Sequence, residues 1–131
     1  MSKIFNISEA ATIAIHSMGV IARSEQVLNA QQISDITGFS KNHTAKVLQQ
    51  LVKNNFLRSN RGPKGGFLLN RDPEQVSLME IYRLIEGDIE ESACKMHCES
   101  CPFRTCIFGG LSEKFSREFK NYLTDKKLAT L

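Results

Sequence analysis

The order of helix and turn signals between residues 30 and 69 constrains the fold more than any other feature. Residues 30–36 have helical spacing, and Gly38 follows, which can adopt the left-handed backbone conformation that ends a helix. Ser40 can then cap a longer helix, because its hydroxyl oxygen can accept a hydrogen bond from a free backbone amide. We expect the first helix to bury Ala30, Ile33 and Ile36 or Thr37, and the second to bury Ala45, Val47, Leu48, Leu51 and Val52.

A short helix, a glycine turn and a capped second helix are typical of a helix-turn-helix. The stretch that follows predicts a β-hairpin. Three glycines and one proline lie within the five positions 62–66, and short apolar runs flank this tip on both sides. A helix-turn-helix followed directly by a hairpin is a winged helix-turn-helix. The sequence therefore predicts a mainly α protein with a small β-hairpin wing.

Further helices are predicted on both sides of this unit. One should begin after Ser8, with Glu9 in its first turn, where the helix dipole favours an acid. This helix is apolar nearly all round, so either the rest of the domain or a second subunit should surround it. The run Ser77-Leu78-Met79-Glu80 is a capping box that starts another helix, which should end at Gly87.

The C-terminal part has the spacing of a long amphipathic helix with an aromatic seam, formed by Phe108, Leu111, Phe115, Phe119 and Tyr122. We divide the chain into a winged domain, residues 1–87, a cysteine-bearing loop, residues 88–106, and a C-terminal helix, residues 107–131. Together they should form one compact domain. A chain of 131 residues can bury enough surface to fold without disulfides or metal.

The net charge of +3 is unevenly distributed along the chain. Residues 1–72 carry nine Lys/Arg and four Asp/Glu, whereas residues 73–131 carry eight and ten. Between Asp35 and Asp72 there are seven basic residues and no acidic one. A segment of this length without carboxylates favours contact with a polyanion.

A helix with exposed donors, followed by a basic hairpin, suits double-stranded DNA because the helix fits the major groove. The predicted DNA contacts at the start of the second helix and at the wing tip are Ser40, Lys41, Asn42, His43, Lys46, Arg61 and Lys64. The alternative interpretation is a solvated helix face beside an ordinary hairpin.

The four cysteines of the chain are concentrated in thirteen residues. Their pattern is Cys94-x3-Cys98-x2-Cys101-x4-Cys106. Thiolates this close can ligate one soft metal centre, either zinc or an iron-sulfur cluster. Spacing alone favours structural zinc, although zinc sites usually place a second cysteine pair about ten or more residues after the first. Unliganded thiols are the remaining alternative.

The chain also indicates a compartment. It contains no apolar run near the roughly 20 residues of a membrane span, and residues 1–7 lack the pattern of a signal peptide. We therefore expect a cytoplasmic protein without membrane contact, and a reducing cytosol disfavours disulfides.

Enzymatic function is not expected. The pair Cys98-x2-Cys101 could suggest a thiol oxidoreductase, but the βαβ setting of that motif is missing. The glycine-rich stretch 62–66 lacks the Gly-Lys-Ser/Thr ending of a phosphate-binding loop, and no Ser/His/Asp set is identifiable.

Residues 30–57, followed by Arg61-Gly62-Pro63-Lys64-Gly65-Gly66-Phe67-Leu68-Leu69, resemble the Rrf-type family of bacterial transcription regulators, to which IscR, NsrR, RirA and CymR belong. The wing motif is the most specific part, and the resemblance covers essentially the whole chain. It implies a homodimer, held together by the C-terminal helix, that binds a pseudo-palindromic operator with Arg61 in the minor groove. Residues 40–44 vary among members, so the operator sequence is not implied.

The same resemblance implies that the cysteines hold a 2Fe-2S or 4Fe-4S cluster that senses redox state, nitric oxide or iron. Cys94, Cys101 and Cys106 match the family's three-cysteine pattern, while Cys98 is either a fourth ligand or a spare. Glu9 matches an acid that reaches the partner subunit's cluster in some relatives, although a helix-capping charge is its simpler role. A regulator with structural zinc, or one controlled by a protein partner, remains the alternative.

Overall fold

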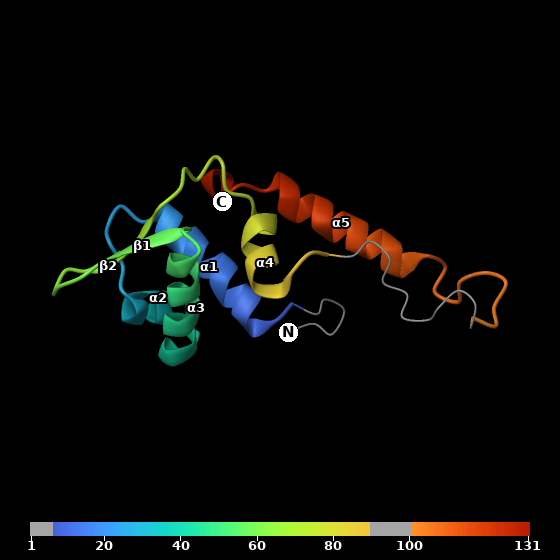
Figure 1. Ribbon diagram of the computed structural model, residues 1–131, viewed down its shortest axis with the longest axis horizontal. Helices are drawn as coiled ribbons and strands as arrows, with labels where there is room; N and C mark the ends of the chain where they lie inside the picture. The colour runs from blue at the N-terminus through green and yellow to red at the C-terminus, as the bar shows by residue number, and fades with distance from the viewer. Residues whose placement is uncertain (1–6, 90–100) are drawn as a thin grey trace.

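A computed structural model describes residues 7–89 and 101–131 of the chain. The fold is mainly α with one two-stranded antiparallel hairpin, as the sequence predicts. Figure 1 shows the helices α1 to α4 gathered at one side and α5 extending away from them. The elements in chain order are α1 (Glu9–Arg23), α2 (Ala30–Thr37), α3 (Lys41–Lys53), β1 (Leu57–Asn60), β2 (Gly66–Leu69), α4 (Leu78–Glu86), α5 (Leu111–Asp125) and the short 3-10 helix η1 (Leu128–Thr130).

Helix α1 is the centre of the core. The Ser8 hydroxyl accepts a hydrogen bond from the Ala11 amide at 3.0 Å, so the predicted cap is confirmed. Ile13 and Met18 are completely buried, and α1 contacts α2, α3, α4, β2 and η1. Of the two alternatives for this helix, packing within its own domain is thereby confirmed, and the apolar residues all around α1 find their packing partners within the chain.

Helices α2 and α3 form the predicted helix-turn-helix. Gly38 ends α2 with a φ of 82°, which a glycine adopts without strain, and the buried Ser34 hydroxyl donates to the Phe39 carbonyl and closes the turn. Ile33 is fully buried as expected. Of the two alternatives for the next buried position, Thr37 is half-buried and its hydroxyl donates to the Ile33 carbonyl at 2.8 Å, whereas Ile36 is 59% exposed.

The wing is a hairpin in which Leu57 lies opposite Leu69 and Asn60 opposite Gly66. Its base is joined to the segment before α2, since the Phe67 amide donates to the Leu28 carbonyl at 2.7 Å. A Cβ atom on Gly66 would lie 2.4 Å from that carbonyl oxygen, so only glycine permits this approach. The wing is thus anchored to the helix-turn-helix at two points, through α3 and through Leu28.

Helix α4 begins with the predicted capping box, in which the Ser77 hydroxyl accepts from the Glu80 amide and the Glu80 carboxylate accepts from the Ser77 amide. It ends at Gly87, as expected. Helix α5 begins at Leu111 instead of residue 107, so this boundary of the prediction is wrong. Gly109 and Gly110 have φ values of 63° and 75°, which are incompatible with a right-handed helix and leave Phe108 outside it.

The chain returns to the winged domain after α5. The Leu128 amide donates to the Val76 carbonyl at 3.0 Å, the Leu78 amide donates to the Lys126 carbonyl at 3.0 Å, and Leu128 is buried. Helix α5 is therefore fixed at its C-terminal end, and its other end projects from the molecule (Figure 1). In the described ranges, no helix has the length and apolar character needed to cross a membrane.

Candidate nucleic-acid interface

Helix α3 separates its apolar and polar side chains onto opposite faces. Val47, Leu48 and Leu51 are buried against the core. The exposed residues of α3 are Lys41, Asn42, Lys46, Gln49, Gln50 and Lys53. Packing therefore holds the backbone of α3 rigidly and leaves a face of hydrogen-bond donors and cations in solvent.

The start of α3 contains the predicted residues Ser40 and His43. The Ser40 hydroxyl accepts a hydrogen bond from the His43 amide at 3.1 Å and so caps the helix. The His43 side chain is 36% exposed, and its Nδ1 lies 3.8 Å from a carboxylate oxygen of Glu9. The fold thus brings together two residues for which the sequence suggests different roles, and this contact connects the beginnings of α1 and α3.

The wing tip carries Arg61 and Lys64, both exposed, on a tight turn closed by a hydrogen bond from the Gly65 amide to the Gly62 carbonyl at 2.9 Å. Strand β1 packs beside α3, so the base of the wing adjoins the helix that carries the other predicted contacts. Figure 1 shows the hairpin extending outward beyond the helices. Because residues 36–71 contain no Asp or Glu, no carboxylate of this segment neutralises its cations.

The turn between α3 and β1 has an organisation that the sequence does not reveal. Asn55 has a φ of 65°, in the left-handed region, and its carbonyl accepts a hydrogen bond from Arg71 Nε at 3.2 Å. Arg71 Nη2 also donates to the Asn54 carbonyl at 3.1 Å. The pair Asn54-Asn55 is a local signal for such a turn, but the partner lies sixteen residues further along the chain.

The predicted metal site is described only in part. Cys94 and Cys98 lie outside the described residues, whereas Cys101 is half-buried and Cys106 is exposed, both as free thiols. Among the residues that are described, no group of three His, Cys, Asp or Glu side chains comes together as a metal site.

Cys106 lies just before the N-terminus of α5. Hydrogen bonds from the backbone amides of Gly110 and Phe108 lower the pKa of its thiol. These amides stabilise the thiolate, which is the form that binds metals. The chemistry of this residue therefore fits a soft metal ion or an iron-sulfur cluster.

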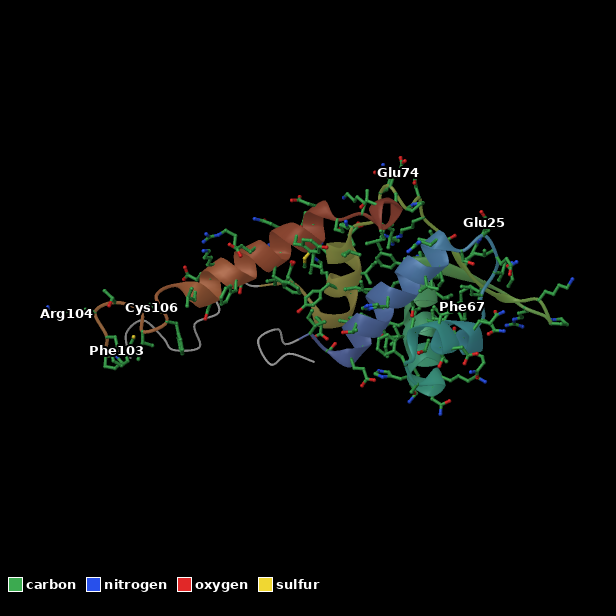
Figure 2. The ribbon with its side chains drawn as sticks, turned by 180° about the vertical axis from the view of Figure 1, so that it is seen from behind. Glu25, Phe67, Glu74, Phe103, Arg104 and Cys106 are labelled. Atoms are coloured by element: carbon green, nitrogen blue, oxygen red, sulfur yellow. The ribbon has the colours of Figure 1, made fainter. Side chains whose placement is uncertain are left out.

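Cys106 lies well away from helix α1 (Figure 2). Figure 2 shows Cys106 beside Phe103 and Arg104 at the distal end of the molecule, beyond the free end of α5. Helix α1, which begins with Glu9, lies within the winged domain and does not approach that end. A contact between Glu9 and a metal centre at Cys106 therefore requires a second copy of the chain.

Helix α5 carries large apolar side chains that the described residues of the chain do not cover. Only Leu123 of this helix is buried, and Phe119 packs edge-on against Tyr82 of α4 with 5.5 Å between the ring centroids. The exposed large apolar residues on α5 and just before it are Ile107, Phe108, Leu111, Phe115 and Tyr122. Surface of this kind marks an interaction site.

Comparison with known proteins agrees with this arrangement. The family model for Rrf2, described as an iron-dependent transcriptional regulator, matches residues 7–131. The chain belongs to the Rrf2 family. The description of the family and the names of its members refer to transcriptional regulation and to no enzymatic activity.

Several relatives carry names that specify regulators. The chain is 38% identical over 82 residues to the putative HTH-type transcriptional regulator BadM of Rhodopseudomonas palustris, which covers 60% of this chain and 53% of BadM. It is 32% identical over 104 residues to NsrR of Bacillus licheniformis, covering 76% of this chain and 69% of that protein. It is 23% identical to IscR of Serratia proteamaculans over 97% of this chain and 74% of that protein. The chain thus spans about half the length of BadM.

Solved structures show the same fold. CymR, the global cysteine regulator of B. subtilis, superposes with a TM-score of 0.77 at 20% identity, covering 95% of this chain and 94% of that one. IscR of T. potens superposes with a TM-score of 0.72 at 22% identity, covering 95% and 84%. The prediction of a winged helix-turn-helix fold is confirmed.

Proposed function

We propose that this Rrf2-family regulator is a cytoplasmic homodimer that binds a specific operator, and that an iron-sulfur cluster controls its affinity for that operator. The observation that carries the DNA-binding part is a helix-turn-helix with exposed cations on α3, joined directly to a wing with two exposed cations at its tip. Both belong to a segment without carboxylates.

Two elements contact the duplex in this proposal. The first turns of α3 enter the major groove, where Lys41, Asn42 and Lys46 face base edges and phosphates. Ser40 caps the start of the helix. His43 lies at the edge of the surface that contacts DNA, because the Glu9 carboxylate lies beside one side of its ring. At the wing tip, Arg61 enters the minor groove and Lys64 binds phosphate.

The second copy of the chain covers α5. Leu111, Phe115 and Tyr122 are each about half-exposed or more. The face that they form therefore leaves apolar surface in contact with water unless another surface packs on it. A two-fold dimer through this face places two copies of α3 at a fixed separation, which suits a pseudo-palindromic operator. The fixed C-terminal end of α5 transmits that separation to each winged domain.

The cysteines are the proposed ligands of the cluster. Cys106, as a stabilised thiolate, and Cys101 would hold it together with Cys94 and Cys98, and Glu9 of the partner subunit is a candidate for a further ligand. When bound, a 2Fe-2S or 4Fe-4S cluster supplies a centre that reacts with oxidants and nitric oxide. The cysteine segment joins α4 to α5, so a change in its conformation alters the placement of α5 and with it the spacing of the two winged domains.

Two measurements test this proposal. Selection of duplexes from a random-sequence pool by the purified protein should recover a common two-fold symmetric sequence, and a duplex bound by one chain alone would contradict the homodimer. Iron, zinc and acid-labile sulfide are then measured in anaerobically purified protein together with its absorbance spectrum. Iron and sulfide in similar amounts support the cluster, whereas one zinc ion per chain without sulfide would contradict it.

A further inference from the structure

Asn70 and Arg71, which follow β2, donate hydrogen bonds to the turn between α3 and β1. Arg71 donates from Nε to the Asn55 carbonyl at 3.2 Å and from Nη2 to the Asn54 carbonyl at 3.1 Å. Asn70 donates from Nδ2 to the same Asn55 carbonyl at 3.3 Å, and its backbone amide donates to the Phe56 carbonyl at 3.1 Å. The exit of β2 is therefore bonded to the connection between α3 and β1.

This turn needs external support. Asn54 is the C-terminal cap of α3, and Asn55 is the one non-glycine residue in the described ranges with a positive φ, at 65°. A left-handed conformation at such a residue costs about 1–2 kcal/mol relative to its usual backbone conformation, although asparagine tolerates it better than most side chains. The two guanidinium hydrogen bonds satisfy the carbonyls of Asn54 and Asn55.

Arg71 also stacks on the core. Its Cζ lies 3.9 Å from the centroid of the Phe56 ring, and Phe56 is buried. A planar guanidinium can stack on a ring with its face while its edge donates to two carbonyls, which the single ammonium group of lysine cannot do. The contact set is thus specific for arginine and not merely for a positive charge.

We propose that Arg71 is a positioning residue that fixes the angle between α3 and the wing, and that it is not one of the cations that bind DNA phosphates. The inference rests on the proposed DNA-binding function. Arg71 lies in the basic run 36–71, yet two of its guanidinium nitrogens are committed to carbonyls. Because α3 and the wing tip must engage one duplex at the same time, a loosened turn weakens the contacts of both.

The variant Arg71→Lys tests the assignment because it keeps the charge and removes the fork of donors. We expect it to lower affinity for a duplex selected by the wild-type protein by about tenfold, which corresponds to about 1.4 kcal/mol. Affinity for an unrelated duplex of equal length should fall much less, and the salt slope should change by less than one, since Arg71 itself binds no phosphate in this proposal. Arg58→Lys, at an exposed position of β1, is the matched control and should bind like the wild type.

A double-mutant cycle with Arg61 distinguishes a positioning role of Arg71 from a contribution of Arg71 to DNA affinity that is independent of the wing tip. If Arg71 holds the wing in place, Arg61→Ala should cost less affinity in the Arg71→Lys background than in the wild-type background. Additive losses would overturn the proposal. It would also be overturned if Arg71→Lys bound like the wild type while Arg71→Ala weakened all duplexes and reduced the salt dependence, because Arg71 would then be a phosphate contact.

Hydrogen exchange tests the positioning without DNA and so distinguishes its failure from failure of the proposed function. Arg71→Lys should speed the exchange of the Asn70 amide, bonded to Phe56, and of the Phe56 amide, bonded to Leu51, while amides in the middle of α1 keep their protection. Faster exchange throughout the protein, or unchanged exchange at the turn, would contradict the assignment. If this pattern is found and the wild type selects no duplex, the proposed function alone fails.

Discussion

The winged domain and helix α5 differ in how they use their apolar residues. Ile13, Leu48 and Ile81 of the winged domain are completely buried, whereas Leu111, Phe115 and Tyr122 of α5 are 49%, 50% and 60% exposed. The first region has a complete apolar core, which holds α3 and the wing in place. The second is held by its C-terminal end and by the contact of Phe119 with Tyr82, and Leu111, Phe115 and Tyr122 lack a covering partner within the described part of the chain. In the proposed dimer, the first region supplies stability and the second supplies the interface.

A charge on the exposed face of α5 should have the largest effect. We expect Phe115→Asp to convert the dimer to a monomer in analytical ultracentrifugation, because a carboxylate would have to be buried in the interface. Affinity for the selected duplex should fall by about 10²- to 10⁴-fold, since the two half-sites are then bound separately. Arg117→Ala, an exposed residue on the opposite face with the same change in net charge, should leave both quantities unchanged. If the Phe115→Asp variant stays a dimer and binds the selected duplex with wild-type affinity, the exposed face of α5 is not the dimer interface.

Leu48→Ala and Leu111→Ala make the same change in the two regions. The first should lower the free energy of unfolding by about 2–5 kcal/mol, because it leaves a cavity beneath α3. The second should change it by no more than about 0.5 kcal/mol at concentrations where the chain is monomeric, because Leu111 is half-exposed. Urea titrations of both variants provide the measurement. Equal losses would show that α5 belongs to the same core as the winged domain.

The two cations of the wing tip should separate base recognition from phosphate binding. Arg61→Ala should cost about 1–3 kcal/mol on the selected duplex and relax the sequence preference at the outer positions. Lys64→Ala should weaken all duplexes alike and reduce the salt slope by about one. Fluorescence anisotropy over a series of salt concentrations distinguishes the two. Identical behaviour of both variants would contradict a distinct role for Arg61.

The smallest expected effect concerns the helix cap at the junction of the two regions. Ser77→Ala removes the acceptor of the Glu80 amide, and we expect a loss of about 1 kcal/mol in the free energy of unfolding. Ser59→Ala, at an exposed position of β1, is the control and should be near neutral. If Ser77→Ala weakens the free energy of DNA binding more than the free energy of unfolding, the start of α4 acts in regulation rather than in folding.

Features that depend on neighbouring residues were predictable from the sequence. Ser8, Ser40 and Ser77 cap helices as expected, and Gly38 and Gly87 end them, because these interactions span a few residues. The capping box of α2, formed by Asn29 and Gln32, carries the same kind of signal, although the prediction did not use it.

Features that depend on distant parts of the chain were not predictable in the same way. The return of Leu128 to Val76 and the bonds of Arg71 to Asn54 and Asn55 join segments that no local pattern connects. Helical spacing leaves Ile36 and Thr37 as alternatives, and packing against the rest of the fold half-buries Thr37 and exposes Ile36. The predicted DNA contacts on α3 and at the wing tip stay a prediction, and so does the four-cysteine site, because Cys94 and Cys98 lie outside the described residues.

In the proposed mechanism, the state of the cysteine site before α5 controls the affinity of α3 and the wing for DNA. The most direct test is the affinity of one protein preparation for the selected duplex at fixed salt, measured with the iron-sulfur cluster loaded and after its removal. The account predicts that the two dissociation constants differ by about 5- to 150-fold, the usual range of coupling between two sites. Equal constants for the loaded and the apo dimer would contradict the account, even with DNA binding intact.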